Sequence, residues 1–149
     1  MTVGEFCNRE VVITTQEATI REVAKLMRQY HVGDVVIVDR SKTPPKPIGI
    51  ITDRDIVVEL IAAEVPLENV TVGDVMSFDL VTARERDGIW DTLQRMRTRG
   101  IRRVPVVNAE GGLEGILTVD DFLELFSEEL LALARVPNRE VAREKKLRE

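Results

Sequence analysis

The sequence predicts a mixed α/β protein, of the α+β kind, made of two β-α-β-β-α repeats packed about a pseudo-twofold axis. The first observation behind this prediction is an internal repeat, because TVGEF at 2–6 recurs as TVGDV at 71–75, an offset of 69 positions. After a longer loop in the first copy the offset falls to 66, so GIITDRD at 49–55 matches GILTVDD at 115–121. The second observation is that short β-branched runs alternate with segments of helical period.

The elements of the first copy follow from these local patterns. The apolar run at 11–14 and the continuous β-branched run at 35–38 predict strands, the second of them fully buried. The apolar positions of 17–30 recur with a helical period, which predicts an amphipathic helix. After a proline-rich turn the chain returns as a strand at 48–52, and a helix follows at 53–63.

The second copy repeats this order. We expect strands at 80–82, 104–107 and 115–118, and helices at 87–99 and 119–133. Neither copy is large enough to bury its sheet face alone, so the two copies are expected to pack against each other.

The chain is therefore divided into repeat one at 1–66, repeat two at 67–134 and a charged tail at 135–149. Nine of the fifteen tail residues are charged, which predicts either a solvated helix extension or a frayed tail. Pro137 is expected to interrupt the helix that precedes it, because proline lacks the N–H that a helix interior needs.

Composition narrows the class of protein. Aromatic residues make up only 4% of the chain, so the core is expected to be aliphatic. A net charge of −5 argues against general nucleic-acid binding, which needs a basic face. The single cysteine fits a reducing compartment. With only one cysteine and one histidine as soft ligands, most metal chemistry, tetrahedral zinc in particular, is not expected. With no apolar run long enough for a membrane span and no visible signal peptide, we expect a cytoplasmic protein.

Four segments carry a resemblance to a known family: HVGDVVIVD at 31–39, GIITDRD at 49–55, GIRRVPVVN at 100–108 and GILTVDD at 115–121. In this order and spacing the chain resembles a tandem pair of cystathionine-β-synthase (CBS) domains, a Bateman module, of the stand-alone prokaryotic type. The resemblance implies clefts between the repeats that bind adenosine-type ligands, dimerisation, and regulation of a separate partner. It implies no catalytic chemistry.

Two Thr-x-x-Asp pairs, Thr52 with Asp55 and Thr118 with Asp121, begin the last helix of each repeat. One interpretation is a capping box, in which each residue bonds the backbone of the other. The other is ligand binding, in which the threonine hydroxyl contacts a phosphate or ribose oxygen. The aspartate then accepts hydrogen bonds from a ribose diol. The two interpretations are compatible.

Arg102 and Arg103 precede the buried strand of the second repeat, where the first repeat has Gly33 and Asp34. The arginines are either a solvated strand end or a guanidinium fork for phosphate. Gly33 is either a plain turn residue or a point of close backbone approach to an adenine. Because the charges differ, we expect the cleft with Arg103 to accept phosphate and the cleft with Asp34 to disfavour it.

The family resemblance also implies where the adenine lies in each cleft, against the first strand and the start of the second strand of one repeat. The first predicted site comprises Val12, Val32, Gly33, Arg103, Thr118 and Asp121. The second predicted site comprises Val81, Ile101, Arg102, Asp34, Thr52 and Asp55.

The expected function is a regulatory module that senses AMP, ADP, ATP, an NAD-type dinucleotide or S-adenosylmethionine and signals to an effector protein. The alternative is a protein-interaction module with degenerate clefts that acts through its dimer surface. An enzyme is not expected, because no nucleophile–base pair, glycine-rich phosphate loop or metal-ligand set is present. We expect no catalytic cofactor, no membrane or nucleic-acid partner, and a homodimer. The apolar surface predicted for this dimer is Ile56, Leu60, Phe122 and Phe126.

Overall fold

The computed structural model describes residues 1–148 and divides the chain into two compact units, Met1–Leu117 and Thr118–Glu149. The first unit holds repeat one and residues 67–117 of repeat two, and each unit is described by itself. The division at 66/67 and at 134/135 remains a prediction. Within the described residues, no helix combines the length and the apolar character needed to cross a membrane.

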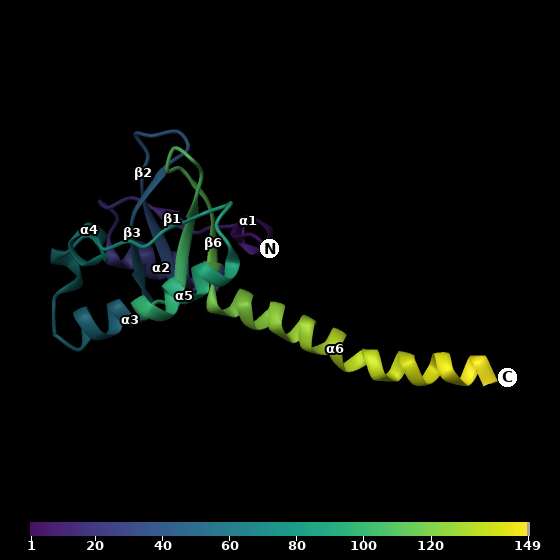
Figure 1. Ribbon diagram of the computed structural model, residues 1–149. Coiled ribbons are helices and arrows are strands. Elements are labelled where there is room, and N and C mark those ends of the chain that lie inside the picture. Colours follow the sequence, from purple (N-terminus) through teal and green to yellow (C-terminus); the bar gives the residue numbers. More distant parts are fainter. Residues whose placement is uncertain (149) are drawn as a thin grey trace. The chain divides into compact units, whose positions relative to one another are not determined.

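Both repeats follow the predicted order of strands and helices, and each is preceded by a short extra helix (Figure 1). The elements of the first repeat are α1 (Val3–Phe6), β1 (Ile13–Thr14), α2 (Ile20–Tyr30), β2 (Asp34–Asp39), β3 (Lys46–Thr52), α3 (Asp53–Asp55) and the π-helix η1 (Ile56–Ile61). Those of the second repeat are the 3-10 turn η2 (Leu67–Asn69), α4 (Val72–Val75), β4 (Ala83–Arg84), α5 (Ile89–Arg99), β5 (Arg103–Val107), β6 (Leu113–Thr118) and α6 (Val119–Arg148).

The strands form two three-stranded sheets of the same order, β1-β2-β3 and β4-β5-β6. In each sheet the first strand runs parallel to the middle strand. The predicted equivalence of 35–38 with 104–107 is confirmed, because these residues form the two middle strands, β2 and β5. Residues 35–38 are all buried, as expected for a strand that is β-branched at every position.

The short helix that opens each repeat binds the other repeat. The Gly4 N–H in α1 donates to the Glu85 carbonyl of the second repeat at 2.9 Å. The equivalent Gly73 N–H in α4 donates to the Gln16 carbonyl of the first repeat, also at 2.9 Å. Both pairs are related by the same offset of 69, so the exchange is reciprocal, as a pseudo-twofold relation requires.

The core is aliphatic, as the composition predicts, and it is shared between the repeats. In one cluster, residues of α2, β2, β3 and η1 pack against Val72 and Met76 of the second repeat. In a second cluster, Ile116 of β6 packs with Val36 and Val38 of β2. The buried members of the first cluster are Ile20, Val23, Met27, Val35, Ile37, Ile51, Ile56, Leu60, Val72 and Met76.

This burial corrects the predicted dimer surface. Ile56, Leu60 and Phe122 are 8%, 3% and 2% exposed, so they belong to the interior of the protein. Phe126 is half-buried and its ring lies 6.3 Å from that of Phe122. Helical period alone identifies an apolar stripe but does not say whether the same chain or a partner covers it.

Two other local predictions were wrong in detail. The strand expected at 80–82 lies at Ala83–Arg84, where it pairs with Val106 and Val107 of β5. The register with the partner strand therefore sets the position of this two-residue element. The helix expected at 53–63 becomes a π-helix after its first turn, with the Ala62 N–H donating to the Val57 carbonyl five residues back.

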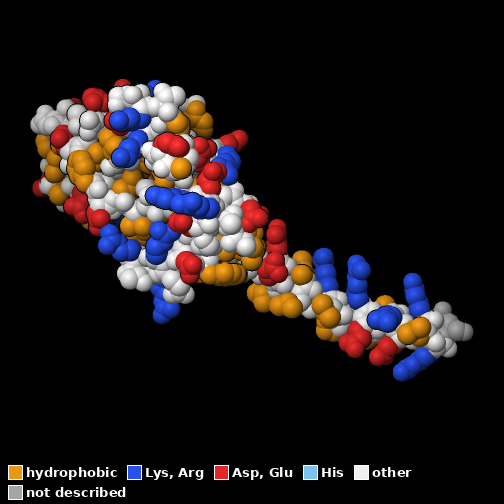
Figure 2. All heavy atoms as spheres, turned by 45° about the horizontal axis from the view of Figure 1, so that its top comes forward, with side chains coloured by type: hydrophobic (Ala, Val, Ile, Leu, Met, Phe, Trp, Pro, Cys, Tyr) orange, Lys and Arg blue, Asp and Glu red, His pale blue; other side chains and the backbone are white. Residues whose placement is uncertain are grey.

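Pro137 does not end the last helix, which contradicts the prediction. Helix α6 runs from Val119 to Arg148 with the proline inside it. A proline removes one hydrogen bond, while the following residues are mostly strong helix formers such as glutamate, arginine, lysine and alanine. The tail is therefore a helix extension. Figure 2 shows hydrophobic side chains among the charged ones along it, and the exposed ones include Leu123, Leu130, Leu131, Leu133, Val136, Val141 and Leu147.

Candidate functional site

A cavity of about 610 Å³ lies between the two repeats, within Met1–Leu117. The end of β3 and the first turn of α3 line it from the first repeat. Residues 77–81 and 100–103 line it from the second repeat. We call this space the inter-repeat cavity, and its lining comprises Ile50, Thr52, Asp53, Arg54, Asp55, Ser77, Asp79, Leu80, Val81, Gly100, Ile101, Arg102 and Arg103.

The structure brings most of the second predicted site together in this cavity. Thr52 and Asp55 from the first repeat face the same space as Val81, Ile101 and Arg102 from the second repeat. These residues are up to 50 positions apart in the sequence, and the packing of the repeats against each other joins them. The sixth predicted residue of this site, the aspartate at 34, contacts Arg103 instead of lining the cavity.

Thr52 and Asp55 form a capping box at the start of α3. The Asp55 N–H donates to Thr52 Oγ1 at 3.1 Å, and the Thr52 N–H donates to Asp55 Oδ2 at 2.9 Å. Within residues 1–148, no hydrogen bond or ion pair engages Asp55 Oδ1. The pair thus forms the predicted capping box, and Asp55 Oδ1 remains available as an acceptor at the cavity.

Arg103 and Asp34 form an ion pair, with 2.8 Å between Nε and Oδ1. Their side chains are only 27% and 16% exposed, so water screens the pair incompletely. Burial raises the pKa of Asp34, Arg103 opposes this, and the nearby Asp53 carboxylate adds to it, leaving the pKa above its ordinary value. The charge pattern assigned Arg103 and Asp34 to opposite clefts, but the structure joins them and their charges offset each other.

Two other arginines of the cavity are free of carboxylates. Arg54 at the start of α3 and Arg102 before β5 are exposed, and neither forms an ion pair with any described residue. A free guanidinium can bind a phosphate with two parallel hydrogen bonds, whereas an arginine already paired with a carboxylate has less capacity for it. Arg54 and Arg102 are therefore free of the carboxylate contact that Arg103 makes, and a phosphate-binding role for Arg103 stays a prediction.

Gly33 lies close to two charged side chains. A Cβ at this position would lie 3.2 Å from Asp53 Oδ2 and 3.3 Å from Arg103 Nη2, closer than most Cβ contacts. The Asp53 N–H also donates to the Gly33 carbonyl at 3.0 Å. A side chain at this position would therefore require Asp53 or Arg103, the cation of the ion pair, to shift by a few tenths of an ångström.

The first predicted site is only partly assembled within the first unit. Val12 and Val32 line a second cavity of about 600 Å³, and its other lining residues are Asn8, Glu10, Val11, Ile13, Leu26 and Tyr30. Thr118 and Asp121 belong to the unit Thr118–Glu149. There they form their own capping box, with the Thr118 N–H and Oγ1 donating to Asp121 Oδ2 at 2.7 and 2.9 Å.

Ser77 and Asp79 line the inter-repeat cavity, and the sequence analysis did not identify them. With the offset of 69 they correspond to Asn8 and Glu10, which line the second cavity. The internal repeat therefore contained a usable signal in the segment before the first strand of each copy. Asp53 was also missed as a cavity residue, because its neighbours Thr52 and Asp55 accounted for the local motif.

Comparisons with known proteins agree with this architecture. The chain is 35% identical over 125 residues to an uncharacterised protein of Methanopyrus kandleri, covering 84% of this chain and 62% of that one. The chain thus spans less than two thirds of the length of this relative.

Two solved structures are also similar. One is the CBS domain pair of protein MJ0100 in complex with 5'-methylthioadenosine and S-adenosyl-L-methionine (TM-score 0.77, 26% identity, 87% of this chain, 98% of that one). The other is the CBS domain protein PAE2072 from Pyrobaculum aerophilum complexed with AMP (TM-score 0.74, 28% identity, 85% of this chain, 99% of that one). The family model for the CBS domain matches twice, at residues 3–62 and 72–128. The chain belongs to the CBS domain family, as a tandem pair.

Proposed function

We propose that this protein is a cytoplasmic regulatory module that binds an adenosine-containing ligand in the inter-repeat cavity and signals to a separate effector protein. The observation that carries the proposal is the lining of the cavity. It combines the Asp55 Oδ1 oxygen and two arginines, none of which is paired with another residue among 1–148, with the apolar side chains of Val81 and Ile101. The adenosine compounds bound by the two similar structures support this ligand class.

Each part of an adenosine ligand has a matching group in the cavity. Val81 and Ile101 offer apolar surface for the base, and Asp55 Oδ1 can accept from the ribose hydroxyls. Arg54 and Arg102 can donate to phosphate oxygens. An adenosine compound that carries phosphate, such as AMP, ADP, ATP or an NAD-type dinucleotide, uses all of these groups. S-adenosylmethionine uses the first two.

The test is calorimetric titration of AMP and adenosine into wild type, Asp55→Asn, Arg102→Ala and a matched control, Asp74→Asn. Asp74 forms the same kind of capping box with Thr71 but does not line the cavity. A hydrogen bond to a charged group contributes roughly 1.5–3 kcal/mol, so Asp55→Asn is expected to weaken both ligands about tenfold to a hundredfold. Arg102→Ala is expected to weaken AMP by a similar factor and adenosine little.

Asp74→Asn is expected to leave both affinities unchanged. An equal loss in Asp74→Asn and Asp55→Asn would show that capping, not ligand contact, explains the effect. If wild type binds no adenine compound, the result favours the alternative hypothesis of a protein-interaction module with degenerate clefts.

We also propose that the protein is a homodimer, with an interface different from the predicted stripe. Val57, Val58 and Ile61 of η1 are 54%, 43% and 59% exposed, beside the buried Ile56 and Leu60. Light scattering is expected to give a mass near twice 16.8 kDa. Val57→Asp/Ile61→Asp is expected to give a monomer of native stability. A strict wild-type monomer would contradict the proposal.

A further inference from the structure

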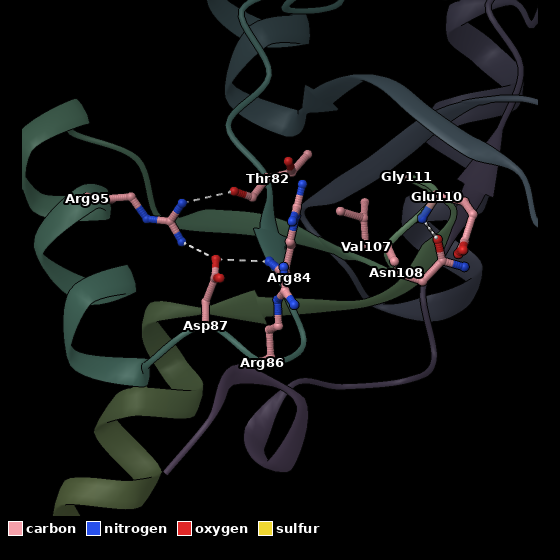
Figure 3. Close-up of a pocket in the computed structure, with 10 residues that line it drawn as sticks. Thr82, Arg84, Arg86, Asp87, Arg95, Val107, Asn108, Glu110 and Gly111 are labelled. Carbon is pink, nitrogen blue, oxygen red and sulfur yellow. Dashed lines mark hydrogen bonds and ion pairs between the residues drawn. The ribbon is translucent and has the colours of Figure 1, made fainter.

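Another cavity, distinct from the two described above, is polar and has a volume of about 600 Å³. It lies where β4 and β5 end in the second repeat (Figure 3). It shares no lining residue with the inter-repeat cavity. We call it the basic pocket, because three of its lining side chains are arginines. Its lining comprises Thr82, Arg84, Arg86, Asp87, Arg95, Val107, Asn108, Ala109, Glu110 and Gly111.

Arg84 and Arg86 bring two free cations to the basic pocket. Arg84 is the last residue of β4, Arg86 lies in the turn that follows on the other side of Glu85, and both are exposed. Glu85 instead pairs with Arg9, and its carbonyl accepts from the Gly4 N–H at 2.9 Å. The contacts of Glu85 with the first repeat hold the turn in place. No carboxylate among the described residues pairs with Arg84 or Arg86.

Arg95 is the third cation, and its position is fixed (Figure 3). Its Nη2 donates to Asp87 Oδ2 at 2.7 Å. The same Nη2 also donates to Thr92 Oγ1 at 3.1 Å. Burial tends to raise the pKa of Asp87, but the Arg84 N–H and the Arg95 guanidinium outweigh it and hold the pKa below its ordinary value. Asp87 is therefore ionised at neutral pH and neutralises Arg95. The remaining charged lining residues are Arg84, Arg86 and Glu110, so the pocket keeps an excess of one positive charge.

The corresponding place in the first repeat has the opposite character. There a smaller cavity, of about 320 Å³, is lined by Thr15, Glu17 and Asp39, with Arg40 as its one lining cation among the described residues. With the offset of 69, Thr15, Glu17 and Asp39 stand where the second repeat has Arg84, Arg86 and Asn108. The same place in the fold therefore does not require arginines at positions 84 and 86. The basic charge of the second repeat therefore needs an explanation other than stability.

We propose that the basic pocket binds the phosphate chain of a small molecule that carries two or more linked phosphates. Guanidinium groups match phosphate oxygens in geometry and remain charged throughout the physiological pH range. The volume falls within the range of small-molecule sites. The phosphate chain can come from an inorganic polyphosphate or from a nucleoside polyphosphate, since both present the same oxygens.

The test is calorimetric titration of inorganic pyrophosphate into the full chain, with the inter-repeat cavity saturated by adenosine. Arg84→Ala/Arg86→Ala is expected to weaken pyrophosphate at least tenfold. Lys25→Ala/Arg28→Ala removes the same charge from exposed positions of α2 and is expected to weaken it less than threefold. Asn108→Asp, which installs the residue of the first repeat, is expected to weaken it as well.

ATP titrated into Asp55→Asn distinguishes the two sources. Binding tighter than that of pyrophosphate supports a nucleoside polyphosphate, and equal binding supports recognition of the phosphate chain alone. Absence of pyrophosphate binding to wild type at millimolar concentration would overturn the proposal. So would equal weakening in Lys25→Ala/Arg28→Ala. Adenosine binding to Arg84→Ala/Arg86→Ala, expected to be unchanged, reports on the inter-repeat cavity separately.

Discussion

The two repeats differ most instructively at Asp34 and Arg103, which occupy the same position in their respective copies. With the offset of 69 they are equivalents, and they meet in an ion pair of 2.8 Å. In an exact twofold arrangement this position would meet its own copy, so any charge there would face a like charge. Because both copies lie in one chain, the two equivalent positions can carry different residues. Opposite charges at these positions then attract each other, where identical charges would repel.

The same divergence recurs elsewhere in the first unit. The basic pocket of the second repeat has Arg84 and Arg86 where the first repeat has Thr15 and Glu17. The backbones of the repeats match in strand order, in the lengths of α1 and α4 and of α2 and α5, and in reciprocal hydrogen bonds. The internal repeat therefore governs architecture, while the chemistry of each site lies in the side chains by which the copies differ.

The largest effect on stability is expected from Arg103→Asp, which gives both repeats the same residue at the shared position. Three carboxylates would then crowd together, because Asp53 already acts on Asp34. Exposed ion pairs contribute up to about 1 kcal/mol, and loss of one partner of a buried pair costs about 3–5 kcal/mol. For this partly buried pair we expect a loss of about 2–4 kcal/mol in the free energy of unfolding, measured by urea denaturation.

The exchange Asp34→Arg/Arg103→Asp is the control, because it restores opposite charges in reversed order. Its stability is expected to lie closer to wild type than to Arg103→Asp. If the exchange is as unstable as the single variant, side-chain packing rather than charge dictates this position.

Much of the fold was predictable because burial leaves a periodic pattern in one sequence. The middle strand β2 was recognised from a continuous β-branched run, β5 from its equivalence to β2 in the internal repeat, and the helices α2 and α5 from 3.6-residue spacing. The ion pair of Asp34 and Arg103 could not be predicted, since the internal repeat shows that the two positions are equivalent but not that the two side chains are in contact. Contacts across a pseudo-axis depend on how the copies pack, and that information is absent from either copy alone.

The limits of local reasoning also explain the wrong element boundaries. Pro137 lies inside α6 because the favourable propensities of the following residues outweigh one lost hydrogen bond. The π-helix η1 has no clear local signature, although its wider turn leaves Ile56 and Leu60 buried beside the exposed Val57 and Ile61. In both cases competing energies of similar size decide the outcome, and a pattern rule captures only one of them.

A second comparison uses the helix ends, where His31 and Gly100 are equivalents. Both adopt the left-handed conformation, with φ of 54° and 64°, and both close a helix by donating to earlier carbonyls. Side chains other than glycine pay about 1–2 kcal/mol there, so Gly100→Ala is expected to lower the free energy of unfolding by about 1 kcal/mol. Apart from the chain neighbours of Gly100, no described residue has an atom within 4 Å of the added Cβ, so a clash would not contribute to the loss.

His31→Gly is expected to raise the free energy of unfolding, by less than Gly100→Ala lowers it. The gain is smaller because a glycine also increases the freedom of the unfolded chain, which offsets part of the relief. Thermal and urea unfolding measure both variants. Equal destabilisation by both substitutions would mean that the His31 side chain, and not the backbone conformation, secures the end of α2.

The smallest expected effect concerns pH and again involves Asp34. Its pKa is raised mainly by burial, so the folded chain keeps this proton at pH values where the unfolded chain has lost it. The stabilisation is complete below the unfolded pKa, about 3.9, and disappears as pH rises through the higher folded pKa. The stability of wild type relative to Asp34→Asn is therefore expected to fall with rising pH in this window and then to level off.

Urea denaturation of both proteins between pH 4 and pH 7 measures this difference. A relative stability that rises with pH would mean that the attraction of Arg103 outweighs burial at Asp34. The expected fall is compatible with the damage caused by Arg103→Asp, because a partly buried ion pair can be costly to assemble and still more costly to break. Such a pair contributes little net stability, but it disfavours any packing of the repeats that would separate Asp34 from Arg103.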